Sequence, residues 1–169
     1  MSAYRKIFNL VVPFIFGVIF ALVVQTSSFY GSTIPEGYIK VQVEKIEIGN
    51  KSAVVILEAE DHSKVLPIYI SREQAIAIDL ALNRVTTPRP MTHELTVNIL
   101  NRIGGKIEYV SVDKVVEGTY YARIIVNGRE VDARPSDGIA LALRSNAPIY
   151  VNSDLMEERG VVIEKVSRV

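Results

Sequence analysis

A succession of strand, hairpin and helix occurs twice in this chain of 169 residues, and it restricts the fold more than any other feature. The strand-like segments are residues 41–48, 53–59 and 65–70 in the first half, and 106–116, 120–126 and 130–133 in the second. We expect Ser71 to cap the helix that follows the first set, and Pro135 to begin the helix that follows the second. Units of this kind pack helices on a mostly antiparallel sheet. We therefore predict an α+β fold built from a duplicated strand-hairpin-helix unit.

The two helices that end these units are apolar on nearly all sides. Residues 75–78 (Ala-Ile-Ala-Ile) align with residues 138–141 (Gly-Ile-Ala-Leu). A helix without a polar face is buried on more than one side. A partner subunit could cover the second side, so we expect a homodimer or a higher homo-oligomer.

An apolar segment near the amino terminus predicts a membrane helix at residues 7–24. Two basic residues precede it, and no further basic residue follows before Lys40. The positive-inside rule then places residues 1–6 in the cytoplasm and the folded part, residues 38–169, outside the cytoplasm. Residues 25–37 are predicted to be a linker. The alternative is a cleaved signal peptide, although residues 24–28 contain no clean Ala-x-Ala site.

The composition excludes several kinds of site. The chain has no cysteine and two histidines, which excludes disulfides, thiolate nucleophiles and zinc sites rich in cysteine or histidine. Its 19 basic and 19 acidic residues give a formal net charge of zero. Proteins that bind nucleic acid usually carry a basic excess that neutralises phosphates, so the overall charge does not favour a nucleic-acid partner.

Two carboxylates lie at the corner between the last strand of the second unit and its helix. Asp132 ends the predicted strand, and Asp137 lies in the first helical turn. They could share a Mg²⁺ or Mn²⁺ ion, as metal-assisted cleavage of phosphodiesters requires. In the alternative, Ser136 or Asp137 caps the helix and Asp132 pairs with an arginine. Arg134 could bind a phosphate through its forked donors or form a buried ion pair.

A second charged cluster lies upstream, where Thr92 is expected to cap a helix. His93 falls in the first turn of this helix, where the helix dipole favours a neutral imidazole that could act as a general base. Arg89 nearby favours an anion site at the start of the helix. Glu94 points elsewhere, because adjacent helical residues are about 100° apart. In the alternative, His93 has a structural role at the helix end.

Three ordered motifs carry a family resemblance. They are residues 66–68 (Leu-Pro-Ile), 89–95 (Arg-Pro-Met-Thr-His-Glu-Leu) and 132–140 (Asp-Ala-Arg-Pro-Ser-Asp-Gly-Ile-Ala) leading to 148–151 (Pro-Ile-Tyr-Val). With them, residues 38–151 resemble the bifunctional nuclease domain family. The resemblance implies a self-associating α+β domain and nuclease activity on both DNA and RNA. The chain departs from the family pattern at Ser71, Gln74 and Glu94, where Gly, Glu and Asp are usual.

Two functions follow as hypotheses. The first is a membrane-anchored nuclease of low sequence specificity that cleaves DNA, RNA or both. It would use His93, Glu94, Asp132 and Asp137 in catalysis, Asp132 and Asp137 as ligands of a Mg or Mn ion, and Arg89 and Arg134 to bind the substrate. The second is a non-catalytic, membrane-anchored binding or assembly module with the same fold, in which the charged corners are ion pairs.

Overall fold

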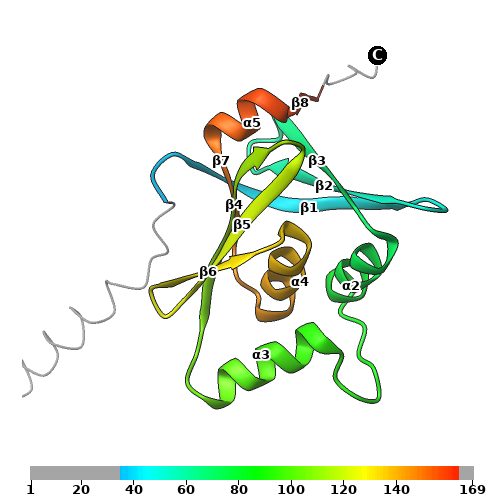
Figure 1. Cartoon of the computed structure of the whole chain (residues 1–169), viewed down its shortest axis with the longest axis vertical. Coiled ribbons are helices and arrows are strands. Elements are labelled where there is room, and N and C mark those ends of the chain that lie inside the picture. The colour runs from blue at the N-terminus through cyan, green and yellow to red at the C-terminus, as the bar shows by residue number, and fades with distance from the viewer. Residues whose placement is uncertain (1–34, 164–169) are drawn as a thin grey trace, which may run out of the picture. The chain divides into compact units, whose positions relative to one another are not determined.

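Eight strands form one sheet within residues 35–163, the part of the chain that the computed structural model describes (Figure 1). The strands are β1 (Tyr38–Ile48), β2 (Ala53–Ala59), β3 (Lys64–Ile70), β4 (Ile107–Val116), β5 (Thr119–Val126), β6 (Arg129–Ala133), β7 (Ile149–Asn152) and β8 (Val161–Val162). Their order across the sheet is β6-β5-β4-β7-β1-β2-β3-β8. All neighbours are antiparallel except β4 and β7, which run parallel. The predicted α+β class and mostly antiparallel sheet are confirmed.

The succession of elements predicted from the sequence is present twice. Strands β1, β2 and β3 form an antiparallel meander that leads into helix α2 (Arg72–Leu82). Strands β4, β5 and β6 form a second meander that leads into helix α4 (Pro135–Ser145). Strand β7 lies between the meanders, parallel to β4 and antiparallel to β1, and joins them into one sheet.

Local sequence accounts for the turns and helix ends. Asn127 and Gly128 both have positive φ angles, 48° and 71°, as a two-residue hairpin turn of the type favoured between strands requires. Ser71 caps α2, and the Gln74 side chain accepts a hydrogen bond from the Ser71 backbone N–H in return. Gln74, at a position where the family usually has glutamate, thus completes a capping box here.

One predicted helix start differs from the structure, and another is confirmed. Helix α3 (Thr92–Arg102) has Met91 rather than Thr92 at its N-cap, with no side-chain cap bond, because Thr92 already has helical backbone. In α4, Pro135 is the first helical residue, as predicted, and the N-cap is Arg134. Neither Ser136 nor Asp137 therefore caps α4. A last helix, α5 (Ser153–Arg159), is capped by the Asn152 side chain.

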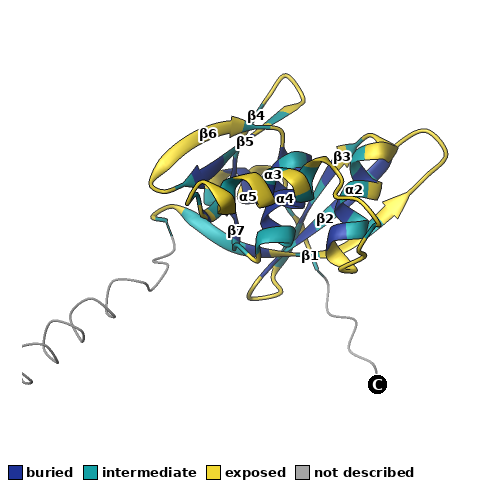
Figure 2. Ribbon diagram, turned by 90° about the horizontal axis from the view of Figure 1, so that it is seen from below, coloured by how far each residue is buried: buried dark blue, intermediate teal, exposed yellow. Residues whose placement is uncertain are grey.

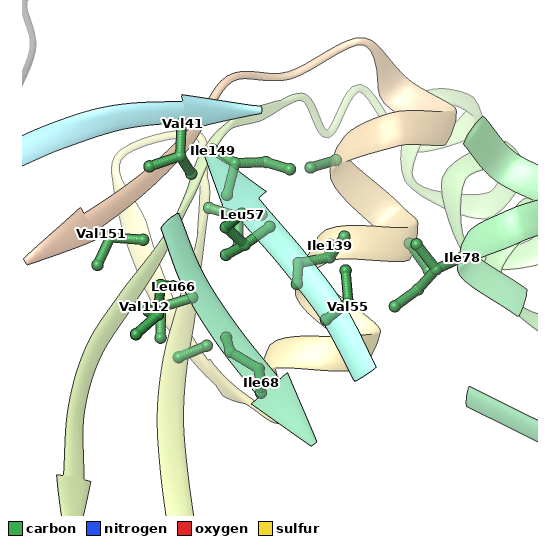
Figure 3. Packing of buried hydrophobic residues seen from close by; sticks show 14 of the residues in the cluster. Val41, Val55, Leu57, Leu66, Ile68, Ile78, Val112, Ile139, Ile149 and Val151 are labelled. Carbon is green, nitrogen blue, oxygen red and sulfur yellow. The ribbon is translucent and has the colours of Figure 1, made fainter. Parts of the chain in front are cut away.

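Helix α4 lies at the centre of the core. Its residues Ile139, Ala140 and Ala142 are completely buried, and Figure 3 shows Ile139 near Val55 of β2 and Ile78 of α2. Helices α2 and α3 both pack against α4, while β4 and β5 lie on its other side. Figure 2 shows buried residues in α4 and in the strands around it. The second covered side of α4, which a partner subunit could have supplied, is supplied by the chain itself.

Gly138 allows α4 to approach the sheet closely. A Cβ atom at this position would lie 2.7 Å from Cγ1 of Val110 in β4. The glycine therefore determines how near the first turn of α4 comes to the sheet.

The predicted membrane helix at residues 7–24 and most of the predicted linker lie outside the described residues. Within residues 35–163, no helix combines the length and apolarity that crossing a membrane requires.

Candidate functional site

The first turns of α3 and α4 bring three charged or titratable side chains together. The His93 Nε2 atom lies 3.2 Å from the Asp137 Oδ1 atom. Arg134 donates from Nε to the Asp137 Oδ2 atom at 2.7 Å and from Nη2 to Oδ1 at 3.2 Å. Asp137 thus lies between a histidine from one helix and an arginine from its own helix, and we call these three residues the His93 cluster.

Backbone features fix the position of each member of the His93 cluster. Arg134 is the N-cap of α4 and lies three residues before Asp137, so the two side chains share one side of the helix. Pro135 has the φ angle that a first helical residue needs. His93 is the second residue of α3, which packs along α4. The cluster therefore depends on the packing of two helices.

The electrostatic environment keeps Asp137 ionised. Burial alone would raise the pKa of Asp137, but hydrogen bonds from Arg134 and His93 outweigh burial and hold this pKa below its ordinary value. The Asp137 carboxylate in turn raises the pKa of Arg134. The Arg134 side chain is 69% exposed, so its guanidinium can contact a ligand from solvent while it remains paired with Asp137.

This arrangement can support acid-base chemistry. An ionised carboxylate only accepts hydrogen bonds, so the contact with Asp137 places a proton on the His93 Nε2 atom. In a neutral imidazole the lone pair of the ring would then lie on Nδ1, and the contact with Asp137 orients the ring. Since the positive ends of two helix dipoles meet here, the site also favours a bound anion.

Asp132 does not join this cluster. In the register of β5 and β6 it lies opposite Arg123, on the face of the sheet turned away from the core residues Ala122 and Ile124. Asp137 belongs to α4, which packs on the core side. The two carboxylates predicted to share a metal therefore point to different sides of the sheet.

The described residues do not form a set of metal ligands. Within residues 35–163, no group of three or more His, Asp or Glu side chains is arranged to hold a metal ion. Both Asp137 carboxylate oxygens already accept hydrogen bonds. The expected Mg or Mn ion stays a prediction.

Glu94 and Arg89 also lie apart from the His93 cluster. Glu94 lines a cavity between α2, α3 and the end of α4. Arg89 is exposed in the segment before α3, where its carbonyl oxygen accepts a hydrogen bond from the Thr87 hydroxyl. Of the six residues singled out from the motifs, the structure brings together His93, Arg134 and Asp137.

A further polar network was not expected from the sequence. Asp113 in β4 accepts hydrogen bonds from the Tyr38 hydroxyl, the Ser111 hydroxyl and the Arg123 guanidinium, and Arg123 also pairs with Glu130. Burial alone would raise the pKa of Asp113, but these three donors outweigh burial and lower it. Because each member has partners in β1, β4, β5 or β6, the network stabilises the sheet.

Comparison with known proteins identifies the family. Residues 55–164 match the bifunctional nuclease domain. The chain belongs to the bifunctional nuclease domain family. An uncharacterized protein of Mycobacterium tuberculosis strain H37Rv is 34% identical over 128 residues, which cover 75% of this chain and 78% of that protein.

Plant relatives of this bifunctional nuclease domain carry nuclease names. Bifunctional nuclease 1 of Oryza sativa subsp. japonica is 30% identical over 117 residues, or 64% of this chain and 35% of the relative. Bifunctional nuclease 1 of Arabidopsis thaliana is 30% identical over 119 residues, or 65% of this chain and 37% of the relative. The match thus spans little more than a third of each plant protein. All three members of the His93 cluster lie within the matched domain.

Proposed function

We propose that this chain is a membrane-anchored nuclease of low sequence specificity that hydrolyses phosphodiesters of DNA, RNA or both at the His93 cluster. The observation that carries the proposal is the contact of His93 with Asp137, with an exposed Arg134 on the same carboxylate. The nuclease names of the plant relatives support the same reaction class.

Each residue of the His93 cluster has a distinct role in this proposal. Arg134 binds the phosphate of the scissile bond through the guanidinium hydrogens that do not contact Asp137. His93 removes a proton from a water molecule at Nδ1, and Asp137 stabilises the imidazolium that forms. The water oxygen bonds to phosphorus while the bond from phosphorus to the ester oxygen breaks. That oxygen takes a proton from solvent, and the His93 imidazolium returns its proton to solvent. Such a general base contributes about 10²–10⁴-fold to the rate.

A divalent metal ion could assist this acid-base mechanism but is not required by it. Magnesium or manganese would stabilise charge on the phosphate. Asp132 and Asp137 are the ligands expected from the sequence, and their placement on different sides of the sheet argues against a shared ion. We therefore assign no step to the metal.

The proposed anchor is the apolar segment at residues 7–24, with the folded part outside the cytoplasm. The substrate would then be nucleic acid from outside the cell. This part of the proposal rests on the sequence alone.

We also propose that the protein forms homo-oligomers through α3. Met91, Leu95, Ile99 and Ile103 follow one another at intervals of four residues and are between 40% and 74% exposed. This α3 ridge lies on the side of the helix away from the buried Val97. It is self-complementary, since two antiparallel copies would place Leu95 against Ile99 and Met91 against Ile103. The ridge and the zero net charge favour the alternative function, a non-catalytic binding or assembly module.

The deciding experiment measures cleavage by the full-length protein in a mild detergent. Substrates are single- and double-stranded DNA and RNA, each with Mg²⁺, Mn²⁺ or EDTA. The test variant is His93→Asn, and the matched control is His62→Asn, since His62 lies in the exposed β2–β3 turn. We expect His93→Asn and Asp137→Asn to lose about 10²-fold or more of the activity, and the control to keep it.

Asp132→Asn distinguishes a mechanism that uses the His93 cluster alone from one that also needs a divalent metal ion. Activity kept by this variant supports the His93 cluster alone, whereas metal-dependent activity lost by a folded Asp132→Asn protein places the reaction at a metal site. Absence of cleavage under every condition, or full activity in folded His93→Asn protein, would refute the proposed active site and favour the binding module.

A further inference from the structure

A cavity of about 570 Å³ lies between three helices, on the flank of α3 that carries Glu94. The end of α2 contributes Arg84, the side of α3 contributes Glu94, Asn98 and Asn101, and the end of α4 contributes Arg144. Its volume falls within the range of about 300–1,000 Å³ that is usual for small-molecule sites. Glu94 follows His93 directly, so it projects about 100° away from the His93 cluster around the helix.

The two arginines of this cavity are not neutralised by the rest of the fold. The Arg144 Nε atom is buried, and no residue in the range 35–163 accepts a hydrogen bond from it. Neither Arg84 nor Arg144 forms a salt bridge with any residue in that range. A buried N–H without a partner is unfavourable, and more so on a charged group. The Nε atom itself has no surface that a ligand could reach, but an anionic group bound at the outer guanidinium nitrogens would balance the charge that the fold leaves unpaired.

The other polar groups of the cavity require a ligand that also donates hydrogen bonds. Glu94 provides a carboxylate, and Asn98 and Asn101 provide amides that both donate and accept. A simple inorganic anion would leave these acceptors unused, whereas a ligand with hydroxyl and amino groups would pair with them.

We propose that this cavity binds a nucleoside monophosphate. The phosphate contacts the guanidinium groups of Arg84 and Arg144, which match it in charge and in forked geometry. The sugar hydroxyls donate to Glu94, and the base contacts the amides of Asn98 and Asn101. The site is separate from the His93 cluster, and its occupation does not depend on the proposed nuclease activity.

Calorimetric titration of the full-length protein in mild detergent tests this assignment. The ligands are AMP, CMP, GMP and UMP, with adenosine and inorganic phosphate as partial ligands. We expect saturable binding of the monophosphates, and binding weaker by about tenfold or more for adenosine and for phosphate, since each offers only part of the contacts. Phosphate that binds as tightly as the nucleotides would overturn the nucleotide assignment.

Matched variants locate the binding site. Arg144→Gln and Arg84→Gln should weaken nucleotide binding about tenfold or more. Arg102→Gln, on the exposed end of α3, should leave it unchanged. Arg144→Lys keeps the charge without the fork and serves as a second test if Arg144→Gln does not fold.

Glu94→Gln tests which group of the nucleotide contacts Glu94, and the choice of assays distinguishes this cavity from the His93 cluster. Glu94→Gln should weaken nucleotides but not phosphate. The two proposals also fail separately, because the nuclease is tested by cleavage, whereas this site is tested by the loss of nucleotide binding in the Arg84 and Arg144 variants. Absence of nucleotide binding, or equal binding by both folded arginine variants, would refute the inference.

Discussion

Replacing Gly138 with alanine should destabilise the fold, although alanine is the better helix former. The new Cβ atom would lie 2.7 Å from the Val110 Cγ1 atom, whereas carbon atoms in contact are about 3.5–4.0 Å apart. Val110 is completely buried, and the χ1 angle of a valine is restricted, so its methyl group cannot easily move aside. Overpacking costs about 1–3 kcal/mol, and replacing glycine in a helix gains up to about 1 kcal/mol. We expect a net loss of about 1 kcal/mol in the free energy of unfolding.

Urea unfolding of four proteins tests this reasoning: the original chain, Gly138→Ala, Val110→Ala and the double variant. Val110→Ala removes the clashing methyl group, so Gly138→Ala in that background should be neutral or stabilising by up to about 1 kcal/mol. The sign of the Gly138 effect should therefore change between the two backgrounds. Stabilisation by Gly138→Ala in the original chain, or the same effect in both backgrounds, would contradict the close approach of α4 to β4.

Two further predictions concern the sheet and the α3 ridge. Asp113→Asn should lower the free energy of unfolding by about 2 kcal/mol at neutral pH, because it removes a charged acceptor shared by three donors, Arg123 among them. Since the pKa of Asp113 is lowered in the folded state, its contribution is present above the unfolded pKa of about 3.9 and is lost as the pH falls through the folded value. Urea unfolding across the acid range should therefore show the difference in free energy of unfolding between the two proteins begin to shrink at about pH 4 and close as the pH falls through the folded pKa of Asp113. A difference that does not shrink with falling pH would refute the ionic contribution. The double variant Leu95→Ser, Ile99→Ser should be a monomer in analytical ultracentrifugation, where the original chain is an oligomer. The control Ile76→Ser, at an exposed position on α2, should remain an oligomer. An unchanged mass of the double variant would exclude the α3 ridge as the interface.

Local signals predicted much of the fold correctly. The Asn127-Gly128 turn and the Ser71 cap depend on a few adjacent residues, so the sequence determined both. The repeated meander and helix followed from the spacing of such signals. The N-cap of α3 was misplaced at Thr92, because a threonine before a helix is a common cap while Met91 has no capping side chain.

The candidate site depended on longer-range geometry. His93 and Asp137 are 44 residues apart and meet only because α3 packs along α4, which no local pattern specifies. The side on which Asp132 lies follows from its pairing with Arg123 across β5 and β6. The prediction that two acids converge at the end of β6 did not consider that successive side chains of a strand point to opposite faces of the sheet. The cavity with Arg84 and Arg144 could not be predicted, since three helices contribute to it.

The position of β7 has a consequence for synthesis of the protein. This strand of four residues fills the gap between β1 and β4, yet the ribosome makes it after both meanders. If the two meanders form before residues 149–152 emerge, β1 and β4 would each present an unpaired edge that can template aggregation. Substitutions that delay the docking of β7 should therefore reduce the yield of folded protein in cells more than they reduce the stability of the protein once it has folded.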